Sequence, residues 1–215
     1  MREFSATYPQ INVRLHELSP SEQHAALVSR RTDISFLRRP PDDADLVTEL
    51  GWTERLGVAL PLGHPLAAAK RITLSDLKDE SHVFLHLGTS RFAQYLWQCC
   101  VEAGFTPKVS QQAAEAYSLI SLVAAGFGVA VVPERIQTLA HPGVVHRLLH
   151  GTRAVADVMM IYRPDPSAVL ATFLQVRATS SQASSRSRPP LSPSVLTQPQ
   201  RCGRNARARF TQDSG

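Results

Sequence analysis

The segment that most constrains the fold is residues 129–133, Val-Ala-Val-Val-Pro, which is apolar at every position. A strand without polar side chains has both faces covered, a pattern typical of parallel sheets between two layers of helices. This segment follows an amphipathic helix that we predict over residues 114–125, with Leu119, Leu122 and Val123 facing the core. A helix directly before a buried strand indicates an α/β fold.

Strands and helices alternate along most of the chain. Residues 11–18 alternate apolar and polar side chains, which predicts a strand with one face in water. With the helix after it and the strand at 34–37, this segment predicts a crossover unit of a parallel sheet. Further strands are expected at residues 47–50, 55–60, 83–86, 108–111, 144–148 and 158–162, and further helices at 91–103 and 167–176.

Two helix starts are readable. Ser19 is a cap, Pro20 occupies the first helical position, and Glu22 lies three residues after the cap. Residues 88–90, Gly-Thr-Ser, cap the helix at 91–103, and Gly104 followed by a proline ends it.

The net charge of +5 belongs to the C-terminal tail. Residues 178–215 hold six arginines and a single acid, Asp213, so the rest of the chain is neutral. A neutral body lacks the basic surface that DNA-binding domains present to phosphates. The tail is rich in Ser, Pro and Arg and buries too little apolar surface to offset its backbone entropy, so we predict that residues 178–215 are disordered.

Several classes of protein are disfavoured. Apolar runs stay well short of the ~20 residues of a membrane span, and the first residues do not resemble an export signal, so a cytoplasmic protein is expected. Cys99 and Cys100 are adjacent and Cys202 is distant, a pattern of unpaired thiols rather than of a metal site. Because no catalytic or phosphate-binding motif is present, we expect no enzyme activity, metal or cofactor.

Five segments, in register over residues 1–177, together resemble the effector-binding domain of the LysR family of transcription regulators. They are Phe4-x-x-x-Tyr8-Pro9; Gln23 to Leu27 with Thr32-Asp33-Ile34; Leu60-Pro61-x-x-His64-Pro65-Leu66-Ala67; Ala103-Gly104-Phe105-x-Pro107; and residues 122–133. Residues 33–40, Asp-Ile-x-Phe-Leu-Arg-x-Pro, are most similar to the branch that senses metabolites of aromatic catabolism and related small carboxylates.

This resemblance implies a two-lobed α/β fold like that of type II periplasmic binding proteins, with a small, usually anionic, organic molecule bound between the lobes. Lobe one is expected to comprise residues 1–80 and 154–177, and lobe two residues 81–153. The family also has a winged helix-turn-helix, a linker helix and a first strand of lobe one before this point. From their absence we expect a truncated gene or a misassigned start, with DNA bound only through the missing part.

The resemblance also implies which residues contact the effector. Helix N-termini favour anions, and Ser19 and Ser21 at one such end match effector-contacting positions, as do Thr89 and Ser90 at another. For all four, plain helix capping is the alternative.

Two further candidates follow strands. Arg38 is expected to hold a carboxylate through two parallel hydrogen bonds; the alternative is a loop arginine paired with Asp42 or Asp43. His86 is expected to donate to the ligand, and the alternative is a core histidine bonded to backbone.

The function predicted from these residues is that of a small-molecule sensor domain of a transcription regulator. The alternatives are an inactive remnant, or a dimerisation partner of intact LysR-type regulators; a solute-binding protein is a weaker one. The expected partners are a small organic anion and copies of this chain or of related regulators, with no membrane contact.

Overall fold

The computed structural model describes residues 2–186, with the side chains of residues 4–177. The described residues divide into two units, one up to Phe173 and one from Leu174 onward, and every described strand belongs to the first. The tail predicted to be disordered lies outside the described residues from 187 onward. In residues 2–186, helices of the length and apolar character that a bilayer crossing requires are absent.

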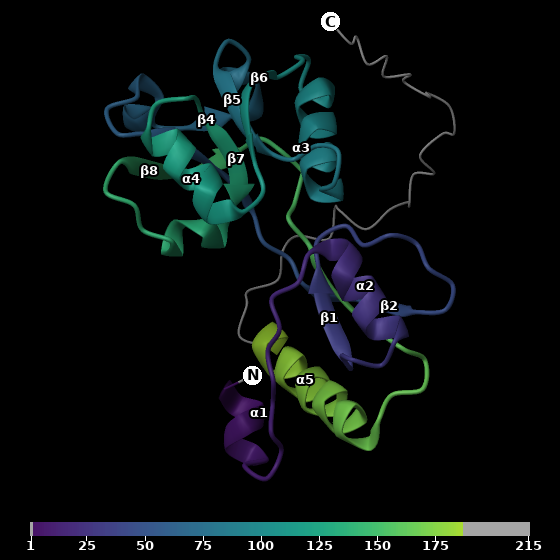
Figure 1. Ribbon diagram of the computed structural model, residues 1–215. Coiled ribbons are helices and arrows are strands. Elements are labelled where there is room, and N and C mark those ends of the chain that lie inside the picture. Colours follow the sequence, from purple (N-terminus) through teal and green to yellow (C-terminus); the bar gives the residue numbers. More distant parts are fainter. Residues whose placement is uncertain (1, 187–215) are drawn as a thin grey trace, which may run out of the picture. The chain divides into compact units, whose positions relative to one another are not determined.

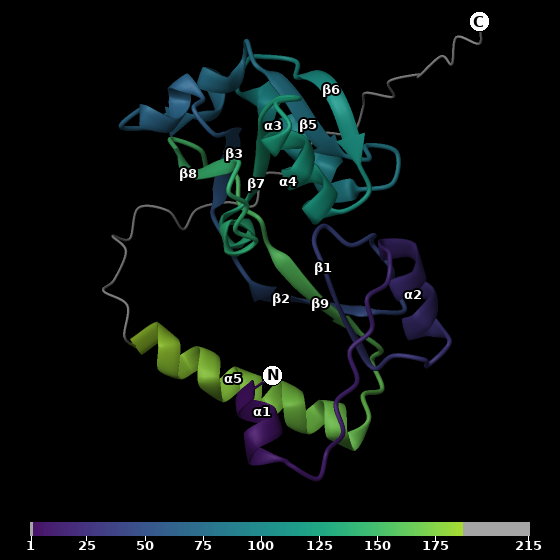
Figure 2. The same cartoon turned by 60° about the vertical axis from the view of Figure 1, so that its left-hand side comes forward.

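One three-stranded sheet has the order β1-β9-β2, with both pairings antiparallel (Figures 1 and 2). We call this sheet and its helices lobe one. Its elements are α1 (Arg2–Thr7), α2 (Pro20–Val28), β1 (Ile34–Leu37), β2 (Val47–Trp52) and β9 (Val158–Tyr162). Leu27 of α2 packs against Leu37 and Ile161 of the sheet and forms a small core.

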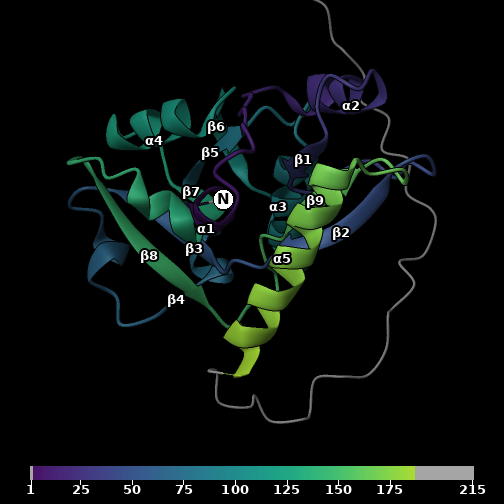
Figure 3. The same ribbon diagram turned by 90° about the horizontal axis from the view of Figure 1, so that it is seen from below.

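Lobe two contains the remaining strands. A four-stranded sheet has the order β4-β8-β3-β7, with β4 and β8 side by side at one edge (Figure 3), and β5 pairs with β6 in parallel. The elements are β3 (Leu56–Pro61), β4 (Ile72–Thr73), β5 (Ser81–Leu85), α3 (Arg91–Glu102), β6 (Lys108–Ala113), α4 (Ala116–Ala124), β7 (Ala130–Pro133) and β8 (Val144–His150). Short 3-10 helices are η1 (Pro65–Ala68), η2 (Leu74–Leu77) and η3 (Glu134–Thr138).

The apolar segment 129–133 is buried as its composition predicts, because helices pack on both faces of the sheet. Ala130 and Val132 belong to the core under α4, whereas Val129 and Val131 belong to the core that includes α3. The pairing is mixed. β7 is antiparallel to β3, whereas Val129, directly before β7, makes a parallel bridge to His82 of β5.

Gly128 is required where this strand approaches β5. Its φ is +146°, and a Cβ atom there would lie 2.2 Å from the carbonyl oxygen of Ser81. The close approach lets Val129 and Ser81 bond through their backbones at 2.8 Å. Gly126, with φ +81°, ends α4 as a left-handed glycine.

The expected strand at residues 11–18 is wrong. These residues form no regular element and are largely exposed, with Leu15 82% exposed. A strand needs a neighbour for its backbone groups, and within residues 2–186 none pairs with this segment. Alternating polarity is therefore insufficient here to define a strand.

The expected lobe boundary at residue 80 is corrected by the strand pairing. β3 and β4 fall within the residues expected in lobe one, yet they pair with β7 and β8. The two connections between the lobes are residues 53–55, which we call the first crossover, and residues 151–157, the second crossover. The sequence marks β3 as a strand but does not show which strand is its neighbour.

The last helix is longer than expected. α5 runs from Ala168 to Arg186, beyond the predicted end at residue 176. A helix satisfies its own backbone hydrogen bonds, so a lack of apolar side chains after residue 177 does not by itself end it.

Candidate functional site

Arg38 follows β1 and reaches both crossovers. Its guanidinium donates from Nη2 to Glu54 Oε2 at 3.0 Å and from Nη1 to the carbonyl oxygen of Ala156. The Arg38 side chain is 23% exposed, whereas that of Glu54 is only 5% exposed. Arg38 also lies over the ring of Phe92, with its Cζ 5.4 Å from the ring centre. The guanidinium is thus held at the first turn of α3.

Glu54 is the residue that sequence reasoning missed. Its carboxylate also accepts the indole N–H of Trp52 at 2.7 Å, and its backbone pairs with Ala156 in the second crossover. A buried carboxylate needs such donors because burial removes its hydration. The alternative pairing of Arg38 with Asp42 or Asp43 is wrong, since the guanidinium pairs with Glu54 instead and Asp43 bonds His24 at 2.5 Å. Nothing in the sequence distinguishes Glu54 from other acids near strand ends.

Ser90 caps α3, as its alternative interpretation predicts. Its Oγ accepts the N–H of Ala93 at 3.1 Å. The backbone N–H groups of Thr89 and Ser90 donate to the carbonyl oxygen of His86 at 3.2 and 2.9 Å. A hydroxyl that accepts one hydrogen bond keeps its own proton for another acceptor, so capping leaves Ser90 able to donate to a ligand. The structure therefore brings Ser90 and Arg38 to the same end of α3.

Ser19 and Ser21 lie at the start of α2 and are both exposed. The Glu22 carboxylate accepts the backbone N–H of Ser19 at 2.9 Å and its hydroxyl at 2.6 Å, so Glu22 supplies its half of the predicted capping box. These bonds also lower the pKa of Glu22. The Ser19 and Ser21 hydroxyls are 3.4 Å apart. Among the described contacts, none joins either serine to Arg38 or to the start of α3.

His86 follows β5 and is exposed, so it is not a core histidine. Its backbone N–H donates to the carbonyl oxygen of Ala113 at 3.0 Å. The core histidine is His82, which is fully buried, with Nδ1 2.9 Å from the carbonyl oxygen of Glu80. Burial lowers the pKa of His82 and keeps its ring neutral.

The lowered pKa of His82 predicts that the free energy of unfolding depends on pH. Burial also lowers the pKa of His146. In the unfolded chain these histidines bind protons more readily than in the folded protein. Their contribution to the free energy of unfolding is therefore fully present at a pH above their unfolded-state pKa of about 6.5, and it decreases as the pH drops below that value. Urea unfolding should give a lower free energy of unfolding at pH 5.5 than at pH 7.5. The variant His82→Leu/His146→Leu should show a smaller difference between the two pH values; an equal difference would contradict the assignment.

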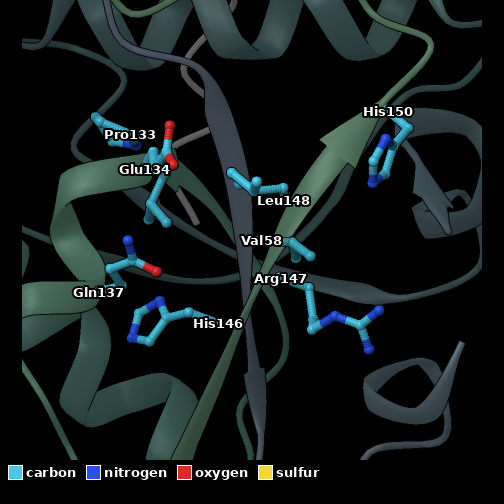
Figure 4. Close-up of a pocket in the computed structure, with 10 residues that line it drawn as sticks. Val58, Pro133, Glu134, Gln137, His146, Arg147, Leu148 and His150 are labelled. Carbon is cyan, nitrogen blue, oxygen red and sulfur yellow. The ribbon is translucent and has the colours of Figure 1, made fainter. Parts of the chain in front are cut away.

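The best-defined cavities among the described residues are lined by none of the six candidate residues. One, of about 300 Å³, lies on a face of β3 and β8. Figure 4 shows His146 and Gln137 close together on one side of β8, while the Arg147 side chain extends away on the other. The Nε2 atom of His146 is buried and has no hydrogen-bond partner among the described residues.

The cysteines behave as buried thiols. Cys99 and Cys100 are both buried, and burial raises the pKa of Cys100 to about 12. Among the described residues, no three His, Cys, Asp or Glu side chains are grouped to hold a metal ion.

The family model "LysR substrate binding domain" matches residues 1–180. The transcriptional regulator AlsR of Bacillus subtilis is 30% identical over 167 residues, which are 77% of this chain and 55% of AlsR. The regulator ClcR of Pseudomonas putida is 28% identical over 82% of this chain and 60% of its own length. The chain spans about half the length of the curated relatives it matches.

Solved structures show the same fold. The effector-binding domain of BenM with its effector benzoate superposes with a TM-score of 0.75 at 24% identity, covering 88% of this chain and 87% of that one. The regulator CbnR gives a TM-score of 0.76 at 22% identity, over 83% of this chain and 63% of its own. The predicted α/β fold of the type II periplasmic-binding-protein kind is therefore confirmed.

Proposed function

Because this chain belongs to the LysR substrate-binding-domain family, we propose that it is the effector-sensing part of a transcription regulator and binds a small organic carboxylate. The observation that carries the proposal is the placement of Arg38 at the first turn of α3, whose start Ser90 caps. A helix N-terminus and a guanidinium both favour an anion. In a solved relative, the BenM effector-binding domain holds benzoate.

The guanidinium of Arg38 can serve a ligand and Glu54 together. It has five N–H donors, and its bonds to Glu54 and Ala156 engage two of its nitrogens. The remaining donors, with the hydroxyls of Thr89 and Ser90, are the proposed anchors of a carboxylate. Thr89 is exposed.

Three further candidates are proposed to line the same site. The exposed hydroxyl of Ser21 and the exposed imidazole of His86 are proposed as outer hydrogen-bond donors to the effector. Ser19 is proposed as a weaker contact, because its hydroxyl proton already points to Glu22.

The activity of the whole regulator is proposed by the same reasoning. The relatives are transcription regulators, not enzymes, and full-length CbnR has been solved in complex with its target DNA. We propose that this chain senses its effector without catalysis in the cytoplasm, that it assembles with further copies or related regulators, and that DNA contacts come from a part of the regulator outside these 215 residues.

A comparison of charged and neutral ligands tests the proposed function. Benzoate should bind the full chain in isothermal titration calorimetry, and benzamide, which has the same shape but no charge, should bind about tenfold more weakly or not at all. The expected ratio reflects a charged hydrogen bond, which contributes ~1.5–3 kcal/mol. Equal affinities for the two compounds, or no affinity for a panel of small carboxylates, would contradict the proposal.

A further inference from the structure

The loop after β1 presents two consecutive arginines to two rings on α3. The Cζ of Arg38 lies 5.4 Å from the centre of the Phe92 ring, and the Cζ of Arg39 lies 3.7 Å from the centre of the Tyr95 ring. Phe92 and Tyr95 are one helical turn apart on the same side of α3, with ring centres 6.1 Å apart. Two guanidinium–ring contacts therefore connect a loop of lobe one to a helix of lobe two.

The backbone of Arg39 is unusual. Its φ is +51°, a left-handed conformation that side-chain-bearing residues rarely adopt. Such a conformation persists where the surrounding contacts hold it. The contact between the Arg39 guanidinium and the Tyr95 ring is one that can hold this residue.

Tyr95 connects this contact to the second crossover. Its hydroxyl oxygen accepts the backbone N–H of Val155 at 3.1 Å. Arg38, the neighbour of Arg39, bonds Glu54 in the first crossover and Ala156 in the second. The tandem arginines and the α3 rings thus meet at the two segments about which the lobes must rotate if they move relative to each other.

We propose that the Arg39–Tyr95 contact is a latch that favours the present arrangement of the two lobes before the effector binds. The inference rests on the proposed function, because the latch holds the same helix whose start carries Thr89 and Ser90. A partly exposed cation–ring contact is weak, so its loss should shift the ratio of molecules in this arrangement to molecules in other arrangements by about two- to fivefold. An effector that binds this arrangement would be assisted by that bias.

Pulsed electron spin resonance on the ligand-free full chain tests the latch directly. Spin labels at Ala44→Cys in lobe one and Gln111→Cys in lobe two, both exposed positions, report the distance between the lobes. Cys99 and Cys100 are buried and label poorly, and Cys202 is replaced by serine. Arg39→Gly should add a population at a new distance, since glycine accepts φ +51° but has no guanidinium. A distribution unchanged by Arg39→Gly would overturn the proposal.

Changes at Tyr95 separate the ring from the hydroxyl. Tyr95→Leu should produce the same new population as Arg39→Gly, and combining the two should add nothing further. Tyr95→Phe retains the ring but loses the hydroxyl that accepts from Val155, so it should produce a smaller new population than Tyr95→Leu. If Tyr95→Leu fails to fold, Arg39→Gly still decides the matter, because an unchanged distribution in that variant refutes the latch.

Arg30 offers a matched control. It is another arginine with a left-handed backbone, φ +60°, and its side chain pairs with Asp165 on the surface of lobe one. Arg30→Gly should leave the distance distribution as it is in the parent; the same new population in Arg30→Gly would show that backbone relaxation, not the latch, is responsible. Because these distances are measured without effector, they stand apart from benzoate affinity. If benzoate binds but Arg39→Gly does not change the distance distribution, only the latch is refuted. If the distribution changes but benzoate does not bind, only the carboxylate proposal is refuted.

Discussion

Replacing Arg38 with alanine should weaken benzoate binding about tenfold or more and lower the free energy of unfolding by about 2–4 kcal/mol. The binding loss follows from removing the charged donor to the carboxylate. The stability loss arises because the Glu54 carboxyl group, whose side chain is 5% exposed, would be left buried without its principal partner. We place the range below that of a fully buried pair because Arg38 is partly exposed. Calorimetry and urea unfolding measure the two effects.

A double variant separates these two effects. Arg38→Met/Glu54→Leu removes both charges and keeps apolar volume, and such replacements are often neutral for stability. It should recover most of the free energy of unfolding lost in Arg38→Ala, yet it should still fail to bind benzoate tightly. If Arg38→Ala keeps the affinity of the parent, Arg38 is a structural residue and not an effector ligand. If the double variant is no more stable than Arg38→Ala, the unpaired Glu54 is not the cause.

Gly128→Ala should destabilise the protein by about 2–5 kcal/mol, because an alanine there meets both an unfavourable φ and a backbone clash. The Cβ atom would lie 2.2 Å from the Ser81 carbonyl oxygen and 2.6 Å from its carbon, neither of which can move independently of β5. The expected result is the loss of the Ser81–Val129 backbone pairing that joins β5 to β7. Thermal and urea unfolding measure the free energy, and hydrogen exchange at Val129 reports the lost pairing.

Gly88→Ala is the matched control. No heavy atom lies within 4 Å of a Cβ built at Gly88. The stability of Gly88→Ala should remain within about 0.5 kcal/mol of the parent, the range usual for surface substitutions. A similar loss for Gly88→Ala and Gly128→Ala would show that the close approach at β5 has no special role.

Local features of this chain were predictable because neighbours in sequence determine them. The cap of α2 requires only Ser19, Pro20 and Glu22, and the structure contains that cap. Gly126 ends α4 through backbone conformation alone. Residues 129–133 are buried because an apolar strand has no favourable exposed arrangement. The family motifs combine such local features, and for that reason they identified the fold.

The candidate site was predictable only in part. Ser90 and Arg38 were singled out from the strand and helix ends that carry them, and the structure brings both to the first turn of α3. Glu54 was not predicted, because its importance comes from burial beside Arg38 and Ala156 rather than from any pattern around it. The contact of Arg39 was not predictable either, because its ring partner Tyr95 is 56 positions away.

The order of amino acids by itself determined which segments are helices or buried strands, where α2 and α4 begin or end, and which family the motifs indicate. Only the tertiary structure decided that β3 pairs with β7 and β8, that residues 11–18 remain without a strand neighbour within residues 2–186, and that Arg38 meets Glu54. The physical reason is the separation in sequence of the residues that interact. Capping, turns and side-chain periodicity depend on residues a few positions apart, whereas strand pairing and buried ion pairs join residues whose proximity exists only once the whole chain has packed.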